Sequence, residues 1–340
     1  MKAAIFDPYL DTLGGGERYC LAFAEVLVRR GWEVDVEWKD PLVRERFKER
    51  FGTSLDGINF VPDVKKGSGY DLCFWVSDGS IPLLHSRKNI LLFQVPFHDV
   101  DGRTLFNRMK LFRINSMICY SKFVKSIIDK EYGIESKVIY PSAETLKIKP
   151  KRKENIIAYV GRFSQLLQSK GQEVLVKAFK KFEKEFPDWK LILAGGGGVG
   201  VGDFISKLEK ESEGHNIEII ESPDFKTLLT IYGKTKIFWS AAGFGVNEKT
   251  NPERLEHFGM TIVEAMVAGA VPLVFEAGGQ KEIIEDEISG FCWNTTNELL
   301  SKTEKLIKDK GKLRTVSEKA RVRSAFFSYD RFEKNILSII

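Results

Sequence analysis

Residues 251–282 read NPERLEHFGMTIVEAMVAGAVPLVFEAGGQKE, and the fold can be worked out from the middle of this stretch. Apolar residues at helical spacing, closed by Gly269, predict a helix over 260–269, and the apolar run that follows predicts a strand over 271–275. The same alternation of helix and strand recurs along the chain. It indicates βαβ units and therefore an α/β fold with parallel sheets.

The alternation runs through two halves of the chain. In the first half we expect strands at 2–6, 33–38, 71–76, 90–95 and 137–140, with helices at 17–29 and 121–131. In the second half we expect strands at 156–160, 190–194, 216–220, 236–239 and 271–275, with helices at 171–185, 203–212, 225–233, 260–269, 298–309 and 311–325. Between the halves lies a polar, lysine-rich stretch that has little capacity to be buried.

Length also favours two domains, because 340 residues exceed what one hydrophobic core usually organises. We therefore expect two Rossmann-like, doubly wound parallel-sheet domains that face a cleft. The first domain covers 1–142, a linker covers 143–155, and the second domain covers 156–325. The remaining segment, 326–340, is helix-like, and it either packs where space is left or crosses back to the first domain.

Composition excludes several classes of protein. The first residues carry one lysine and a short apolar run before Asp7, which predicts a core strand and not a signal peptide. No stretch approaches the roughly 18 to 20 apolar residues of a membrane span. The four cysteines are scattered without a CxxC pair, which is typical of reduced core cysteines. We therefore expect a cytoplasmic protein that does not cross a bilayer.

The sequence predicts neither a metal site nor a cofactor. The four histidines are dispersed and match no ligand spacing: His85, His98, His215 and His257. No pair of carboxylates at DxD spacing stands at a suitable strand end.

Three glycines, Gly14, Gly15 and Gly16, lie between the first strand and a helix that opens at Glu17. Glycine lets an anion approach the backbone closely, and a helix N-terminus adds a favourable dipole. The spacing fits neither GxGxxG nor a Walker A loop ending in GKS or GKT, which argues against a nicotinamide enzyme. The glycines are therefore either a phosphate loop with free N–H groups or a flexible connector.

Two cations flank the carboxyl end of the strand at 156–160. Arg162 follows the strand directly, and Lys170 comes just before the next helix. Ligands of doubly wound sheets bind at this end of the strands, and fixed positive charge suits a diphosphate leaving group. The alternative interpretation is a pair of solvated surface cations.

Two glutamates are separated by seven residues in the quoted stretch. Glu256 would lie in a loop before the helix at 260–269, and Glu264 would lie within the helix. A carboxylate on an otherwise apolar helix needs a partner, because burying an unpaired charge is costly. Ribose hydroxyls could supply that partner, although two glutamates at this spacing also arise by chance.

Several motifs together resemble the retaining GT-B glycosyltransferases of family 4, in that family's order and over nearly the whole chain. They are GGGER, YSKFVKSIIDKEYG before VIYP, VGRFS followed by KG, the two glutamates of EHFGMTIVEAMVAGAVPLV, and GGQKEII. The block FWSAAGFGVNEKTNPERLEHFG resembles bacterial members and, more loosely, the eukaryotic lipid-linked oligosaccharide mannosyltransferases. The resemblance implies transfer of a hexosyl group from a UDP- or GDP-sugar to a glycan, lipid-linked or other hydroxyl acceptor, with retention and without a metal.

The resemblance also implies roles for particular residues. Arg162 and Lys170 would neutralise the diphosphate, and Glu256 would contact the hydroxyls of the transferred sugar. Glu264 would bind the ribose. The full donor-binding set is Gly14, Gly15, Gly16, Arg162, Lys170, Glu256, Phe258, Gly259, Met260 and Glu264. The first domain would hold the acceptor and the second the nucleotide sugar.

The chain departs from the family pattern at two places. Arg162 and Lys170 are eight positions apart, which is more than usual, with FSQLLQS between them. Family members often have a histidine after the strand at 90–95, where this chain has Gln94 and only later His98.

Positive charge is concentrated in residues 103–153, which hold thirteen Lys and Arg against four acids. Within this segment Leu105, Phe106, Met109 and Phe112 share one helical face beside basic residues. Such a helix either lies on an anionic membrane or packs against a core with its basic face solvated. Nucleic acid is a poorer explanation, because no recognition motif accompanies the charge.

Two other functions stay open. A sugar-nucleotide epimerase or hydrolase on the same architecture would need an acid or base near the sugar, and only Glu256 is available. A non-catalytic sugar- or lipid-binding module would not need a pair of cations for a leaving group.

Overall fold

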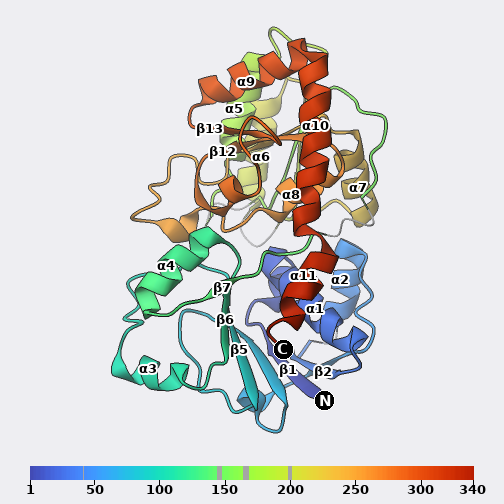
Figure 1. Ribbon diagram of the computed structural model, residues 1–340. Coiled ribbons are helices and arrows are strands. Elements are labelled where there is room, and N and C mark those ends of the chain that lie inside the picture. The colour runs from blue at the N-terminus through green and yellow to red at the C-terminus, as the bar shows by residue number, and fades with distance from the viewer. Residues whose placement is uncertain (41, 144–147, 164–167, 198–200) are drawn as a thin grey trace. The chain divides into compact units, whose positions relative to one another are not determined.

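The computed structural model describes residues 1–40, 42–143, 148–163, 168–197 and 201–340. The chain divides into two compact units (Figure 1). The first unit consists of Met1–Ser142 and Tyr329–Ile340, and the second of Ala143–Ser328. Residues 144–147 of the expected linker lie outside the described residues, and the described part of the linker groups with the second unit.

The first unit is built on a seven-stranded sheet in the order β3-β2-β1-β4-β5-β6-β7. Its strands are β1 (Lys2–Phe6), β2 (Glu33–Glu37), β3 (Ile58–Val61), β4 (Leu72–Val76), β5 (Lys88–Phe93), β6 (Ser116–Cys119) and β7 (Lys137–Val138). Its helices are α1 (Gly15–Arg29), α2 (Val43–Phe51), α3 (Leu105–Leu111), α4 (Lys122–Tyr132) and α11 (Tyr329–Leu337). Each described strand pair is parallel, and β1 pairs with both β2 and β4.

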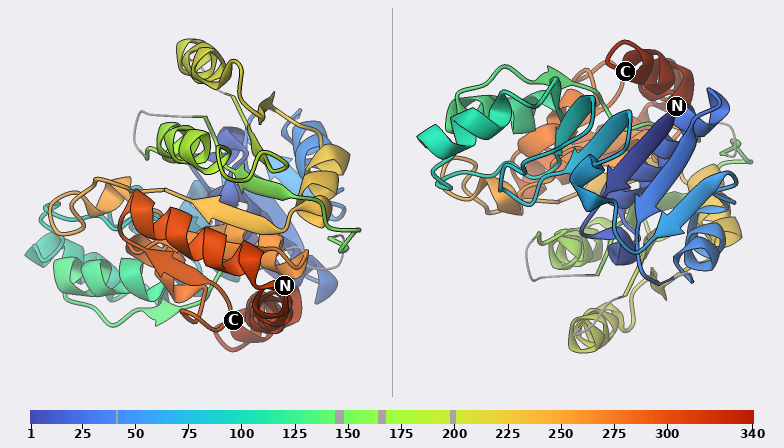
Figure 2. Two further views of the ribbon diagram at one scale, coloured as in Figure 1. Left: turned by 90° about the horizontal axis from the view of Figure 1, so that it is seen from above. Right: turned by 90° about the horizontal axis from the view of Figure 1, so that it is seen from below.

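The second unit is built on a six-stranded sheet in the order β10-β9-β8-β11-β12-β13. Its strands are β8 (Ile156–Val160), β9 (Lys190–Gly195), β10 (Ile217–Glu221), β11 (Ile237–Ser240), β12 (Val271–Phe275) and β13 (Phe291–Trp293). Its α-helices are α5 (Gln172–Phe182), α6 (Gly202–Ser212), α7 (Phe225–Lys234), α8 (Met260–Val267), α9 (Thr296–Lys308) and α10 (Lys310–Ser324). Helix α5 contacts α6 and α9, whereas α8 contacts α7 and α10, so the helices form two layers with the sheet between them (Figure 2).

Both sheets reverse their strand order at one point. In the first unit the reversal lies between β1 and β4, and in the second it lies between β8 and β11. The connections on the two sides of such a point run to opposite faces of the sheet, which leaves a crevice at the carboxyl ends of the strands. The position of the candidate site follows from this topology.

The last helix, α11, completes the core of the first unit. Phe332 and Ile336 are buried in the same apolar cluster as Tyr19 of α1, and Arg30 pairs with Glu333 at 3.2 Å. Figures 1 and 2 show the two chain ends near each other as a result.

Most predicted elements are found, but short or polar elements were missed. Strands β3, β6 and β13, which have four, four and three residues, were not predicted, because runs this short carry little periodicity. Helix α2, in which only Val43 and Phe47 are buried, was not predicted either. The helix predicted over 260–269 ends at Val267, because Gly269 adopts a φ of +82° and Ala270 N–H donates back to Ala265.

Candidate functional site

The second unit brings Lys170 and Glu256 together at the point where its strand order reverses. Lys170 Nζ lies 2.8 Å from Glu256 Oε2, although the two residues are 86 positions apart. Lys170 belongs to the loop that follows β8, and Glu256 belongs to the long connection that follows β11. The Lys170 side chain is also held by Gln168, whose Oε1 accepts a hydrogen bond from Nζ at 3.1 Å.

A glycine holds the loop after β8 against β11. Gly171 is the N-cap of α5 with a φ of +70°, and a Cβ there would lie 2.5 Å from the carbonyl oxygen of Ala241. Any other residue at 171 would push this loop away from the end of β11, because both the space and the backbone conformation favour glycine. Lys170 is thereby fixed at the carboxyl edge of β8 and β11.

Two further glycines hold the loop that carries Glu256. Added Cβ atoms at Gly278 and Gly279 would lie 2.4 Å from the carbonyl oxygen of Glu256 and 2.1 Å from that of His257. Gly279 N–H donates to the Glu256 carbonyl at 2.7 Å. Buried Gln280 accepts from Ser240 Oγ at 2.8 Å and donates to the Ala242 carbonyl at 2.9 Å. The GGQKE segment therefore positions the loop that carries Glu256.

Electrostatics keep Glu256 ionised. Burial by itself would raise the pKa of Glu256, but the charge and hydrogen bond of Lys170 outweigh burial and, with Arg162 contributing, hold this pKa below its usual value. Lys170 is 9% exposed, whereas Arg162 is exposed to solvent. Since Lys170 and Glu256 neutralise each other, Arg162 supplies the positive charge that remains in this group. Residues 164–167, between the two cations, lie outside the described residues.

His257, to which the sequence analysis gave no role, joins this cluster. Burial lowers the pKa of His257 to about 4, so the ring is neutral at pH 7. Its Nε2 lies 2.9 Å from Nε2 of Gln168, which also donates to the Leu255 carbonyl at 2.8 Å. Its position directly after Glu256 was the available sequence signal.

The N-terminus of α8 follows the Glu256 loop. Gly259 precedes the helix with a φ of +108°, a conformation that favours glycine. Phe258, Gly259 and Met260 are all buried, and the Phe258 ring packs against Phe327 with centroids 5.4 Å apart. Phe258 therefore anchors the loop by packing inward.

Glu264 has a partner within the chain. Its side chain is 7% exposed, and Tyr232 Oη of α7 donates to Glu264 Oε2 at 2.6 Å. The carboxylate on this apolar helix was expected to need a partner, and the tyrosine hydroxyl supplies one. This contact joins residues 32 positions apart and leaves no local pattern in the sequence.

The glycine run of the first unit differs from the expectation of free N–H groups. Gly14 N–H donates to Glu17 Oε2 at 2.5 Å, so this donor is already satisfied. A Cβ on Gly16 would lie 2.2 Å from Gln94 Oε1, so glycine at this position makes room for the Gln94 side chain. Only Gly15 is exposed.

Two buried acids lie beside this glycine run. Burial, together with the charge of Glu17, raises the pKa of Asp7 to about 7. Asp7 and Glu17 are 1% and 4% exposed. Acidic side chains therefore lie at the end of β1, whereas Arg162 and Lys170 follow β8 in the second unit.

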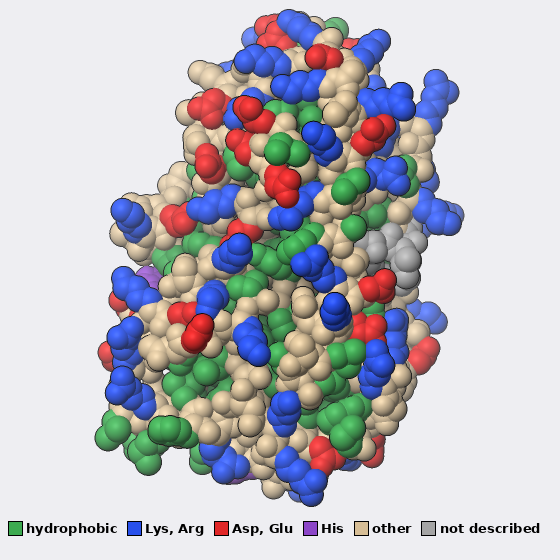
Figure 3. Space-filling model, viewed as in Figure 1, with side chains coloured by type: hydrophobic (Ala, Val, Ile, Leu, Met, Phe, Trp, Pro, Cys, Tyr) green, Lys and Arg blue, Asp and Glu red, His purple; other side chains and the backbone are tan. Residues whose placement is uncertain are grey.

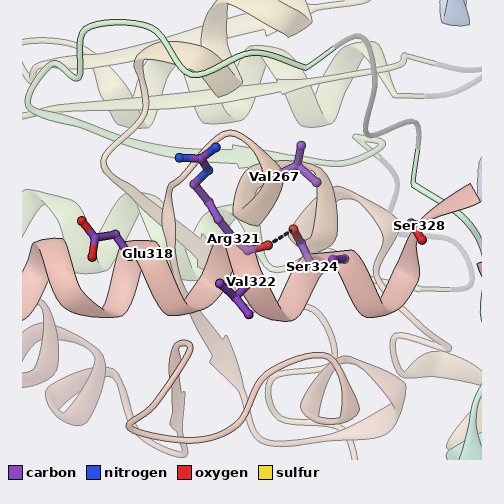
Figure 4. Close-up of a pocket in the computed structure, with 7 residues that line it drawn as sticks. Val267, Glu318, Arg321, Val322, Ser324 and Ser328 are labelled. Atoms are coloured by element: carbon purple, nitrogen blue, oxygen red, sulfur yellow. Dashed lines mark hydrogen bonds between the residues drawn. The ribbon is translucent and has the colours of Figure 1, made fainter.

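A groove of about 500 Å³ on the second unit lies elsewhere. Residues of α10, the turn after it and Val267 at the C-terminal end of α8 line it (Figure 4). The residues predicted to bind the donor do not line this groove. Within the described ranges, no group of three or more His, Cys, Asp or Glu could hold a metal. No helix among these residues has the length and apolar character that a membrane span needs.

Comparison with protein families gives a match over half of the chain. The sequence model of the family described as "Glycosyl transferases group 1" matches residues 142–323. The "GDP-Man:Man(3)GlcNAc(2)-PP-Dol alpha-1,2-mannosyltransferase" of Dictyostelium discoideum is 24% identical over 64% of this chain and 44% of its own length. The Homo sapiens protein of the same name is 26% identical over 55% of this chain and 38% of its own. The chain thus spans less than half the length of these curated relatives.

Solved structures share the fold. A glycosyltransferase from Rickettsia africae superposes with a TM-score of 0.78 at 18% identity, covering 99% of this chain and 97% of that one. Anabaena Alr3699/HepE, solved with UDP and glucose, superposes with a TM-score of 0.76 at 17% identity, covering 99% and 98%. Two Rossmann-like units with parallel sheets are the GT-B fold, as the sequence analysis expected.

The lowered pKa of His257 predicts a pH dependence of stability. Between a folded pKa of about 4 and an unfolded pKa of roughly 6.5, the unfolded chain binds more protons than the folded chain. The free energy of unfolding therefore falls as pH drops through this window, by roughly 2 to 3 kcal/mol. We expect His257→Gln to remove most of this loss.

Urea unfolding at a series of pH values between neutral and acidic measures this effect. The matched control is His85→Gln, because His85 is an exposed histidine of the first unit, and it should leave the pH dependence as in the unmodified protein. If His257→Gln and His85→Gln give the same dependence, the neutral buried state of His257 is wrong.

Proposed function

Because this chain belongs to the group 1 glycosyltransferases, we propose that it transfers a hexosyl group from a UDP- or GDP-sugar to a hydroxyl acceptor, with retention and without a metal. The observation that carries the proposal is the Lys170–Glu256 pair, with Arg162 in electrostatic range, at the carboxyl edge of β8 and β11. Ligands of doubly wound sheets bind at this edge, and an excess cation there suits a diphosphate.

The names of relatives support a range of donors and acceptors. The curated relatives are named for GDP-mannose and a dolichyl-diphosphate-linked glycan, whereas Alr3699/HepE was solved with UDP-glucose. We therefore propose a UDP- or GDP-sugar as donor and a glycan, lipid-linked or other hydroxyl compound as acceptor. The proposed site of action is the cytoplasm.

The proposed chemistry divides the cluster into two roles. As the glycosidic bond breaks, its electron pair passes to the diphosphate oxygen, and Arg162 and Lys170 stabilise the added negative charge. The acceptor oxygen attacks from the same face, and its proton passes to the departing phosphate. Glu256, ionised beside Lys170, accepts hydrogen bonds from sugar hydroxyls. These cations supply the positive charge that a metal ion supplies in other transferases.

The remaining donor contacts are proposed from the family resemblance. Glu264 would bind the ribose while it keeps its bond to Tyr232. The backbone of Phe258, Gly259 and Met260 would face the sugar and phosphates at the start of α8. Gly15 and Gly16 remain candidates for close approach to the diphosphate, whereas the Gly14 N–H is already bonded to Glu17.

The epimerase or hydrolase alternative is less well supported. Such an enzyme needs a group that can give a proton to the sugar or its leaving oxygen at neutral pH. Burial raises the pKa of Glu256, but Lys170 lowers it by more, so the pKa lies below its usual value. Glu256 is therefore an ionised carboxylate at neutral pH and has no proton to give. A non-catalytic module would have no use for a pre-arranged cation cluster.

The first prediction from this proposal concerns the metal. We expect UDP or GDP to raise the melting temperature equally in EDTA and in magnesium, because Arg162 and Lys170 supply the positive charge. UMP and GMP, which lack the second phosphate, should stabilise the protein less. Stabilisation that disappears in EDTA would contradict metal independence.

The second prediction concerns Arg162. In Arg162→Ala, kcat should fall on the order of 10² to 10³, which corresponds to roughly 3 to 4 kcal/mol of transition-state stabilisation. The KM for the donor should rise less, by about tenfold, because the charge matters most when the leaving group is most negative. Arg314→Ala on α10 removes an exposed arginine and serves as the control. If KM rises while kcat is unchanged, Arg162 only anchors the ground state.

The third prediction concerns Glu264. Glu264→Ala should weaken nucleotide binding by about 1 to 3 kcal/mol as charged hydrogen bonds are lost. Tyr232→Phe removes the internal bond to this carboxylate but keeps the carboxylate itself, and it should bind nucleotide nearly as well as the unmodified protein. Isothermal titration measures both affinities. Equal losses in the two variants would mean that Glu264 is structural.

A further inference from the structure

Helix α3 of the first unit turns its apolar side chains to solvent. The exposed fractions are 75% for Leu105, 74% for Phe106, 61% for Met109 and 91% for Phe112. Every residue of the helix is exposed or partly exposed. The interpretation of α3 as a helix packed against the core is therefore wrong, because these side chains do not contribute to the core.

Polar contacts hold α3 in place instead. Thr104 caps the helix by accepting from the Asn107 N–H. The Arg103 guanidinium donates to the Lys130 carbonyl at the end of α4, and Arg113 Nε donates to the Leu84 carbonyl at 2.7 Å. The helix is thus tied at both ends to the first unit, and this fixes its apolar face outward.

Basic residues border this face. Residues 103–113 contain four cations and no acid, and Figure 3 shows hydrophobic side chains gathered at the lower-left edge of the molecule with Lys and Arg beside them. At 3.6 residues per turn, Leu105, Met109 and Phe112 fall within an arc of about 60°, with Arg108 and Lys110 on opposite sides of the apolar face. Lys110 Nζ lies 5.9 Å from the Phe106 ring centroid.

We propose that this face docks on an anionic lipid bilayer. The α3 face consists of Leu105, Phe106, Met109 and Phe112, bordered by Arg103, Arg108, Lys110 and Arg113. The apolar side chains enter the boundary between headgroups and acyl chains, while the cations stay at the level of the lipid phosphates. This surface is independent of the donor chemistry, so it goes beyond the proposed function.

The charge pattern favours a bilayer over a second copy of the chain. A symmetric dimer through this face would bring four cations against four cations, because each copy contributes the same patch. An anionic bilayer matches the apolar face and the basic border together. Exposed apolar clusters of this kind mark interaction sites.

The test is co-sedimentation of the full chain with vesicles of phosphatidylcholine alone or with roughly one third phosphatidylglycerol. We expect binding to the anionic vesicles that weakens as salt rises. The double variant Phe106→Ser/Phe112→Ser should lower the partition coefficient about tenfold or more. Arg108→Gln/Lys110→Gln should lower it about tenfold and reduce its dependence on salt.

The matched control is Ile288→Ser, which replaces another exposed apolar residue, 46% exposed, that follows three acidic residues. It should bind vesicles as the unmodified protein does. Melting temperatures report folding, and the exposed positions of Phe106 and Phe112 predict little change. The proposal fails if the unmodified protein does not bind anionic vesicles, or if it and the double variant bind equally.

Two further outcomes separate the alternatives. A concentration-dependent dimer that the Phe106→Ser/Phe112→Ser variant abolishes, without vesicle binding, would assign the face to a second copy and overturn the proposal. UDP and GDP binding is measured on the same samples. Nucleotide binding without vesicle binding overturns only the bilayer proposal, whereas vesicle binding without nucleotide binding overturns only the proposed function.

Discussion

The ion pair between Lys170 and Glu256 depends on a constraint of parallel sheets, which bring the carboxyl ends of distant strands to one edge. The pair forms at 2.8 Å across 86 positions of sequence. It needs Gly171, Gly278 and Gly279, because side chains there would collide with the neighbouring loop backbones. An ion pair with little solvent access is stable only while both partners are present, so the three loops and the pair hold one another in place.

The pair also prepares the electrostatics of the site before any ligand arrives. Lys170 and Glu256 offset each other, and burial keeps His257 neutral, with a pKa of about 4. Arg162 remains exposed with its charge available to an incoming anion. Groups fixed in this way do not have to reorganise when charge develops during a reaction, and such preorganisation is a main source of electrostatic catalysis.

The strand order of the second unit recurs in the first, which adds β7, but the two units differ in the side chains that follow their first strands. At the end of β1 the first unit has buried Asp7, and Glu17 accepts a hydrogen bond from the Gly14 N–H. At the end of β8 the second unit has Arg162, with Lys170 following in the same loop. The excess cation at the second edge favours an anionic ligand, which supports different roles for the two units in spite of their common architecture.

The sequence by itself determined the fold class and named Arg162, Lys170, Glu256 and Glu264, because buried strands such as β8 and β12 and short motifs leave local patterns. Only the tertiary structure decided that Tyr232 is the partner of Glu264, since a contact between separate elements has no periodicity. The same reason applies to α3. Its amphipathic pattern fits a core helix and a surface helix equally, and burial is a property of the neighbours in space and not of the pattern.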